Sequence, residues 1–148
     1  MSGVRLAIVV SRFNRAVTDN LLEGAREAAA AKGVELSEDQ IFPVPGAFEV
    51  PVVAMAAARS GRFDAVVCLA AVIRGETPHF EYVSAEAAAG VQRVALDTGV
   101  PVAFGVLTTD TVEQAMERAG GRVGNKGYEA VVTAVETLEQ LERIRGRR

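Results

Sequence analysis

The sequence contains the uninterrupted apolar run Ala65-Val66-Val67-Cys68-Leu69-Ala70-Ala71-Val72-Ile73, which lies between Asp64 and Arg74. A strand with one face in solvent would carry a polar residue at every second position, and this run carries none. Its nine residues are also too few to cross a membrane. The run therefore predicts a buried central strand of a parallel sheet that helices cover on both faces.

Short β-rich runs and longer helical patterns alternate on both sides of this segment. Further strands are predicted at 6–10, 40–44 and 101–107, and helices through 21–32 and at 48–60, 78–98, 111–118 and 130–143. Right-handed crossovers then favour a three-layer α/β/α sandwich, flavodoxin-like, with a central four-stranded parallel sheet. Ligands of such folds bind beyond the carboxyl ends of the strands, so we expect the site in the loops that follow them.

Length and charge restrict the class of protein. The 148 residues suffice for a substantial core, and we expect 1–148 to form a single domain. Hydrophobic residues make up 49% and charged residues 24%, a composition that excludes disorder. The formal net charge is −3, although four of the last six residues are arginines, and this balance argues against nucleic-acid binding. We interpret the arginine-rich end as solvated, with weak polyanion contact as the alternative.

No pattern indicates export or metal binding. The apolar stretch that follows Arg5 has only five residues, too few for a signal peptide. Cys68 is the sole cysteine, so it cannot form an internal disulfide, and its apolar neighbours favour buried packing over nucleophilic chemistry. We therefore expect a cytoplasmic protein without membrane contact. A single His and a single Cys exclude a zinc site.

The loop after the central run, Arg74-Gly75-Glu76-Thr77-Pro78-His79, is the most informative one. Gly75 permits close backbone approach, Thr77 suits an N-cap, and Pro78 suits the first helical position. Free N–H groups would then point at one place at the positive end of a helix dipole, which favours an anion of phosphate size. The alternative is an ordinary helix start whose donors are met by Thr77 and water.

His79, the single histidine, falls in the first turn of the same helix. The helix dipole disfavours the imidazolium form there, so the ring should be neutral near neutral pH and able to accept a proton. Beside a bound phosphate it would be able to pass protons in both directions during a multi-step reaction. The alternative is a surface histidine without a chemical role.

Two more loops carry candidate binding residues. Pro45 and Gly46 fix the loop after the second strand, which could present backbone groups and Glu49 to a polyol, unless Glu49 only complements a helix dipole. Phe13 follows the first strand, where an aromatic face suits stacking on a flat ring, with a core or interface role as the alternative. Neither a Gly-x-Gly-x-x-Gly nor a P-loop motif is present in the sequence, which argues against a dinucleotide enzyme or a P-loop protein.

Four motifs follow one another along the chain. They are Val44-Pro45-Gly46-Ala47-Phe48-Glu49-Val50-Pro51, Val72-Ile73-Arg74-Gly75-Glu76-Thr77-Pro78-His79-Phe80-Glu81-Tyr82-Val83, Phe104-Gly105-Val106-Leu107-Thr108-Thr109 with Glu117-Arg118-Ala119-Gly120, and Gly124-Asn125-Lys126-Gly127. Together they resemble the 6,7-dimethyl-8-ribityllumazine synthase family over about 4–141. The resemblance implies condensation of 5-amino-6-(D-ribitylamino)uracil with 3,4-dihydroxy-2-butanone 4-phosphate in riboflavin biosynthesis. Phosphate and water would be released, and no metal or redox cofactor is implied.

The resemblance also implies a role for individual residues. Phe13 would stack on the pyrimidine, Ala47, Phe48 and Glu49 would hold the ribityl chain, and Ala71, Val72 and Ile73 would contact the pyrimidine through their backbone. Glu76 and Thr77 would offer N–H groups to the phosphate together with the Arg118 guanidinium, and His79 would be the proton shuttle. Phe104 and Lys126 would come from a neighbouring subunit, and Glu129 would orient His79.

An assembly is implied as well. The family resemblance makes the unit a homo-oligomer, a ring of five chains with each site at a subunit junction. The compact turn at 120–127 resembles that of members whose twelve pentamers close into an icosahedral capsid of sixty subunits, and riboflavin synthase is a partner that the resemblance leaves open. Two alternatives stay open beside the enzyme, a non-catalytic flavin or lumazine carrier and a shell protein on the same scaffold.

Overall fold

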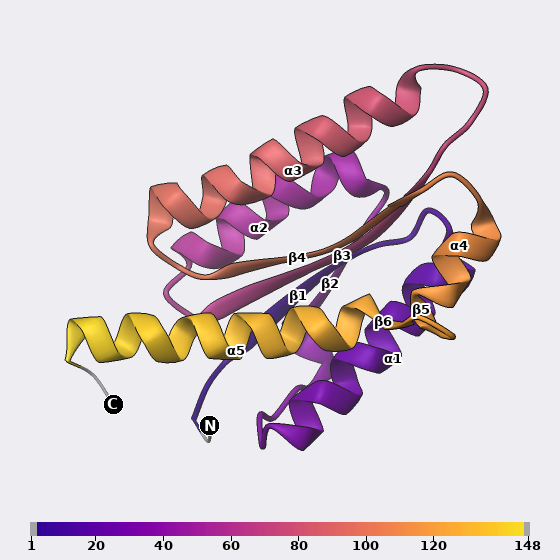
Figure 1. Ribbon diagram of the computed structural model, residues 1–148. Coiled ribbons are helices and arrows are strands. Elements are labelled where there is room, and N and C mark those ends of the chain that lie inside the picture. The colour runs from indigo at the N-terminus through magenta and orange to yellow at the C-terminus, as the bar shows by residue number, and fades with distance from the viewer. Residues whose placement is uncertain (1–2, 147–148) are drawn as a thin grey trace.

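Four parallel strands form the sheet at the centre of the molecule, in the order β2-β1-β3-β4 (Figure 1). The structure, a computed structural model, describes residues 3–146, so Arg147 and Arg148 of the arginine-rich end lie outside it. The strands are β1 (Leu6–Ser11), β2 (Ile41–Val44), β3 (Ala65–Ile73) and β4 (Val102–Thr109). The four predicted strands and their parallel arrangement are confirmed.

Strand β3 is interior to the sheet, as its unbroken apolar sequence predicts. Val67 is paired with Ile8 of β1 on one side and with Ala103 of β4 on the other. Successive side chains of β3 point to opposite faces of the sheet, so that Val67 lies in one apolar cluster and Cys68 in the other. Both faces of the strand are therefore covered.

Two pairs of helices make the outer layers. Helices α2 (Val50–Arg59) and α3 (His79–Thr98) cover one face of the sheet, and α1 (Arg15–Ala31) and α5 (Lys126–Arg145) cover the other (Figure 1). Each pair encloses its own cluster of buried side chains against the sheet. The predicted three-layer α/β/α sandwich of the flavodoxin type is thus confirmed.

Cys68 is fully buried in the cluster on the α2/α3 face and is not bonded to another cysteine. Burial raises the pKa of its thiol to about 12, because the thiolate would lose its hydration. The predicted packing role of Cys68 is confirmed.

The region between α4 (Val112–Glu117) and α5 differs from the prediction. Gly120 and Gly121 predict only a break after the helix at 111–118. In the structure, a short antiparallel hairpin of β5 (Ala119–Gly121) and β6 (Gly124–Asn125) occupies this stretch. Helix α5 begins at Lys126, one turn before the predicted start at 130, because Asn125 Oδ1 accepts hydrogen bonds from the N–H groups of Gly127 and Tyr128.

Two 3-10 turns also depart from the predicted elements. Residues Glu38–Gln40 form one such turn, so that β2 begins at Ile41 and not at Gln40. Residues Ala47–Glu49 form another, which precedes α2 where the sequence predicts the first turn of the α-helix itself. Within 3–146, none of the helices is long and apolar enough to cross a membrane.

Candidate active site

A cavity of about 610 Å³ opens at the carboxyl ends of β1, β2 and β3, and we call it the His79 pocket. It is lined by Phe13, Asn14, Pro45, Gly46, Ala47, Phe48, Glu49, Ala71, Val72, Ile73, Gly75, Thr77, His79, Phe80, Tyr82 and Val83. The cavity therefore gathers nine of the predicted site residues from three separate loops. Glu76, which precedes Thr77, is exposed and does not line it.

The loop after β1 is held against its neighbours by backbone contacts. The N–H groups of Arg12 and Phe13 donate to the carbonyls of Val44 (2.8 Å) and Pro45 (3.1 Å). Asn14 adopts the left-handed region with φ 63°, which asparagine tolerates better than most residues, and its Nδ2 donates to the Ala71 carbonyl at 2.9 Å. The Phe13 side chain is left 70% exposed beside the cavity, free to meet a ligand or a second chain.

The loop after β2 combines a buried anchor with exposed side chains. Ala47 is buried, Phe48 is 60% exposed and Glu49 is half-buried. A side chain at Gly46 would bring its Cβ within 3.2 Å of Glu49 Oε1, so glycine makes room for the carboxylate there. The loop thus presents an aromatic ring and a carboxylate to the same cavity.

Helix α3 begins at His79, one residue later than predicted, with Pro78 at its N-cap position. The expected N-cap role of Thr77 is therefore wrong, although its hydroxyl, one residue before the N-cap, accepts from the His79 N–H at 3.4 Å. His79 itself is exposed to solvent and lies in the first turn of α3, as the sequence predicts. The ring is thereby accessible to a ligand in the pocket.

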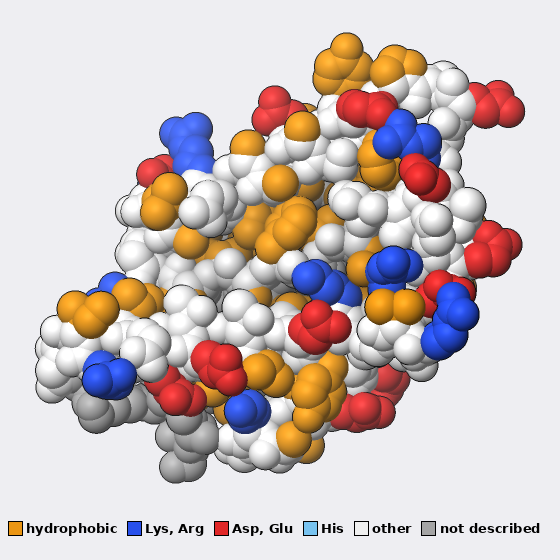
Figure 2. Space-filling view, viewed as in Figure 1, with side chains coloured by type: hydrophobic (Ala, Val, Ile, Leu, Met, Phe, Trp, Pro, Cys, Tyr) orange, Lys and Arg blue, Asp and Glu red, His pale blue; other side chains and the backbone are white. Residues whose placement is uncertain are grey.

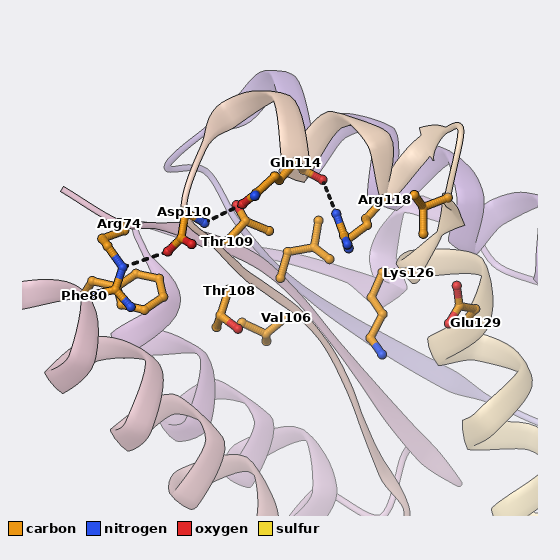
Figure 3. Close-up of a pocket in the computed structure, with 12 residues that line it drawn as sticks. Arg74, Phe80, Val106, Thr108, Thr109, Asp110, Gln114, Arg118, Lys126 and Glu129 are labelled. Atoms are coloured by element: carbon orange, nitrogen blue, oxygen red, sulfur yellow. Dashed lines mark hydrogen bonds and ion pairs between the residues drawn. The ribbon is translucent and has the colours of Figure 1, made fainter.

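A second cavity, of about 650 Å³, lies at the carboxyl end of β4, and we call it the Arg118 pocket (Figure 3). It is lined by Arg74, Phe80, Val106, Leu107, Thr108, Thr109, Asp110, Gln114, Arg118, Val123, Lys126 and Glu129. Phe80 lines both cavities, whereas His79 and Phe13 line only the first. Within one chain, Glu129 and His79 therefore lie in different pockets.

The β5–β6 hairpin brings Arg118 and Lys126 together. Ala119 pairs with Asn125 across the hairpin, and the Lys126 N–H donates to the Arg118 carbonyl at 2.8 Å. The Arg118 guanidinium donates to the Gln114 carbonyl at 3.1 Å, which keeps it over the last turn of α4. The hairpin thus adds two cationic side chains to a cavity that Arg74 also lines. These three cations exceed the two carboxylates of Asp110 and Glu129 in the lining, so the cavity suits an anion.

Phe104 lies outside both pockets. It is half-buried in the middle of β4, packed against the apolar cluster on the α2/α3 face. Figure 2 shows hydrophobic side chains gathered in the hollow between α3 and α5, over this edge strand. The sequence motif indicates Phe104 as a site residue, but the single chain places it on an open surface.

Sequence reasoning gave no separate role to several residues that line these cavities, among them Asn14, Arg74, Phe80 and Tyr82. Asn14 is recognisable as a helix-preceding residue suited to the left-handed conformation. The other three follow strand β3 in a helix-start segment, and nothing in their spacing distinguishes them from surface residues. Among residues 3–146, no group of three or more His, Cys, Asp or Glu side chains is arranged to hold a metal ion.

The fold and these cavities define a class, an α/β sandwich protein with a histidine-bearing pocket at the carboxyl edge of its sheet and a separate cationic pocket beside it. The model of the 6,7-dimethyl-8-ribityllumazine synthase family matches residues 3–142. A protein named 6,7-dimethyl-8-ribityllumazine synthase from Syntrophus aciditrophicus (strain SB) is 56% identical over 142 residues, covering 96% of this chain and 92% of that protein. The chain belongs to the 6,7-dimethyl-8-ribityllumazine synthase family.

Proposed function

We propose that the chain condenses 5-amino-6-(D-ribitylamino)uracil with 3,4-dihydroxy-2-butanone 4-phosphate in riboflavin biosynthesis, at a site built on the His79 pocket. It is a transferase that forms 6,7-dimethyl-8-ribityllumazine and releases phosphate and water. Family membership over nearly the whole chain carries this conclusion. The pocket supports it, because an exposed aromatic ring, a carboxylate and a histidine converge there from three loops.

The reaction needs positioning more than it needs a strong catalyst. The ring amine attacks the butanone carbonyl and water leaves, after which phosphate is eliminated and the ribitylamino nitrogen closes the second ring by adding to the remaining carbonyl, with loss of a second water. Holding both substrates in one cavity supplies the proximity. His79 would take and return the protons that these steps exchange, since it lies at the cavity and is open to solvent.

The binding roles follow the arrangement of the loops. Phe13 would stack on the pyrimidine, while the backbone of Ala71, Val72 and Ile73 would pair with its polar edge. Ala47, Phe48 and Glu49 would hold the ribityl chain. Glu76 and Thr77 would offer N–H groups to the phosphate, and Arg118 would neutralise the charge of the departing anion.

The unit that acts would be a homo-oligomer. Arg118 and Lys126 line a cavity that contains neither His79 nor Phe13, so one chain presents two incomplete half-sites. Phe13 and Phe48 are more than half exposed, as expected of side chains that a second chain covers. A ring of five with Phe104, Arg118 and Lys126 completing the neighbour's site accounts for both features. The sixty-subunit shell, riboflavin synthase as a partner, the cytoplasmic location and the single domain 1–148 belong to the same proposal.

Mixing both substrates with the purified protein should produce a compound with the absorbance of a lumazine, faster than the spontaneous reaction. A carrier would bind the product without raising this rate, and a shell protein would do neither. Equilibrium binding of a substrate analogue separates the last two. A rate equal to the spontaneous one would overturn the proposed function.

A further inference from the structure

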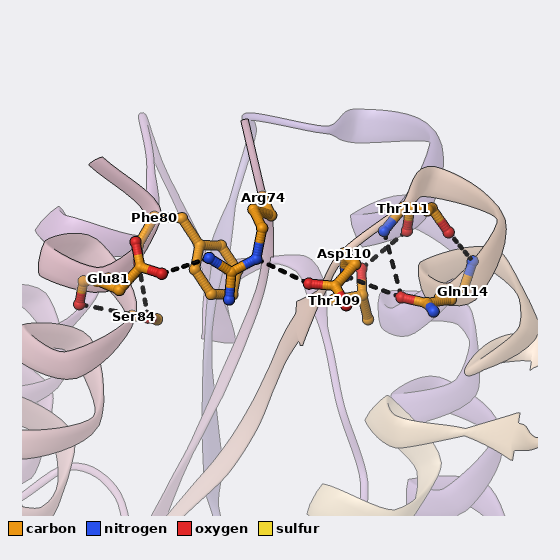
Figure 4. A network of polar contacts seen from close by, with 8 residues as sticks. All are labelled: Arg74, Phe80, Glu81, Ser84, Thr109, Asp110, Thr111 and Gln114. Carbon is orange, nitrogen blue, oxygen red and sulfur yellow. Dashed lines mark hydrogen bonds and ion pairs between the residues drawn. The ribbon is translucent and has the colours of Figure 1, made fainter. Parts of the chain in front are cut away.

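Arg74 lies between the two pockets and has no part in the roles described above. It directly follows β3, and its N–H donates to the Thr109 carbonyl at 2.8 Å, so the backbone pairing between β3 and β4 extends to it. Its side chain contacts carboxylates from two different elements (Figure 4). Of these, Glu81 lies in the first turn of α3, and Asp110 follows β4.

Towards α3, the Arg74 guanidinium forms an ion pair with Glu81 and lies over the Phe80 ring, 4.4 Å from its centroid. Both partners directly follow His79 in the first turn of the helix. This side of the guanidinium therefore fixes the turn that carries His79.

Towards α4, Arg74 Nε donates to Asp110 Oδ1 at 2.8 Å. The N–H of Asp110 donates in turn to Gln114 Oε1 at 2.8 Å, within the capping box that begins α4. The Gln114 carbonyl accepts from the Arg118 guanidinium at 3.1 Å. A continuous chain of polar contacts thus runs from the turn of His79 to the side chain of Arg118.

Within this network of polar contacts, opposite charges stabilise one another in their ionised forms. Hydrogen bonds from Arg74 lower the pKa of Glu81, and those to Asp110 and Glu81 raise the pKa of Arg74, so the Arg74–Glu81 pair remains charged near neutral pH. The Arg74 side chain is 46% exposed, and an ion pair of this exposure adds little to the stability of the fold. Its contacts therefore constrain geometry more than they stabilise the protein.

We propose that Arg74 is a positioning residue for the condensation, which sets the place of His79 through Glu81 and Phe80 and the place of Arg118 through Asp110 and Gln114. A planar guanidinium presents its donors in fixed directions to two carboxylates on different sides, whereas a lysine ammonium is a point charge on a flexible stem and fixes neither direction. The inference depends on the proposed function, because it assigns Arg74 to the two half-sites of that reaction.

The test measures kcat and the KM of each substrate for Glu81→Ala, Asp110→Ala and Arg74→Gln. Glu81→Ala should lower kcat about fivefold or more with nearly unchanged KM values, because the turn of His79 loses its anchor. Asp110→Ala should raise the KM of the butanone phosphate about fivefold or more, and that of the pyrimidine less than about twofold. Arg74→Gln should do both, and Arg74→Lys should reproduce at least one of the changes.

Arg93→Gln is the matched control. Like Glu81, Arg93 lies on α3, but it pairs with Asp97 and lines neither pocket. It should leave all constants within about twofold of the wild type. Thermal unfolding of each variant separates a positioning effect from a folding defect. Should Arg74→Gln fail to fold, the two carboxylate variants still decide the question. Wild-type activity together with unchanged constants in the variants overturns this inference alone, whereas an inactive wild type overturns the proposed function.

Discussion

His79 lies in the first turn of α3 beside the cavity that collects the predicted pyrimidine and ribityl contacts. Because two reactive substrates held together still condense without a proton shuttle, we expect His79→Ala to lower kcat by only about 10- to 100-fold. Steady-state kinetics with both substrates saturating would measure this. Complete loss of activity in a variant that folds and binds substrate would mean that the histidine does more than move protons.

Arg118 is expected to act on one substrate only. Its guanidinium is held by the Gln114 carbonyl at the mouth of a cationic cavity. We therefore expect Arg118→Ala to raise the KM of the phosphate-bearing substrate by about tenfold or more, since a hydrogen bond to a charged group is lost, and to change that of the pyrimidine little. Equal increases in the two KM values would argue against a phosphate role.

Glu81 gives the stability of the fold a small dependence on pH in a defined direction. The hydrogen bond from Arg74 lowers the pKa of this carboxyl below its ordinary value of 4.5. The folded state therefore gains stability from Glu81 above the unfolded pKa, and loses it as the pH falls through the folded pKa. Urea unfolding of the wild type and of Glu81→Ala should give a difference in unfolding free energy that is constant near neutral pH and shrinks below pH 4.5. A difference that stays constant in acid would contradict this pairing.

At the scale of elements, the start of α5 depends on a close approach to α1. The backbone of Gly127 lies so near α1 that a Cβ would stand 1.9 Å from the Leu21 carbonyl oxygen. Gly127→Ala must therefore move one helix against the other, and we expect a loss of about 1–3 kcal/mol in unfolding free energy. Displacement of the adjacent Lys126 should weaken substrate binding as well.

Gly75→Ala is the matched control for stability, because a Cβ there meets no atom within 4 Å and the backbone is outside the left-handed region. Denaturant unfolding should show a lower unfolding free energy for Gly127→Ala than for Gly75→Ala. If Gly127→Ala is as stable as Gly75→Ala, the helices are less tightly fixed than the structure indicates.

The four sheet strands could be predicted because short, unbroken apolar runs between polar or turn residues indicate buried strands directly. The hairpin at 119–125 could not, since two adjacent glycines indicate a break as readily as a tight turn. Helix α5 begins early because of a capping contact by Asn125, a signal that was present in the sequence but weaker than the apolar stripe that follows.

The candidate site likewise has one part that the sequence predicts and one part that it does not. Phe13, Glu49 and His79 were predictable as neighbours, because they follow strands whose carboxyl ends lie at one edge of a parallel sheet. The family resemblance added Ala47, Phe48 and residues 71–73, and Asn14, Phe80 and Tyr82 were missed. The network around Arg74 depends on the register that places Ile73 opposite Thr109 and hence Arg74 beside Asp110. That register is a tertiary property, and no local pattern of the sequence encodes it.

At the scale of the whole molecule, one chain has two cavities with different functional side chains, which we propose to be the two halves of a shared site. His79 and Phe13 line one cavity, and Arg118 and Lys126 line the other. The open hollow over β4, where Phe104 lies, adds an apolar surface between α3 and α5 (Figure 2). A second chain that covers these surfaces would join the Arg118 half of one site to the His79 half of the next.

This arrangement predicts complementation between two variants that are each impaired when the substrates are below saturation. Phe13→Ala damages one half-site and Arg118→Ala the other, so a mixed oligomer contains some junctions in which both halves are intact. After dissociation and reassociation of the mixture, part of the activity should return, while each variant treated alone should regain none. Native mass spectrometry of the mixture would establish both the number of chains and their exchange. Absence of recovery in oligomers shown to have exchanged subunits would place the complete site within a single chain.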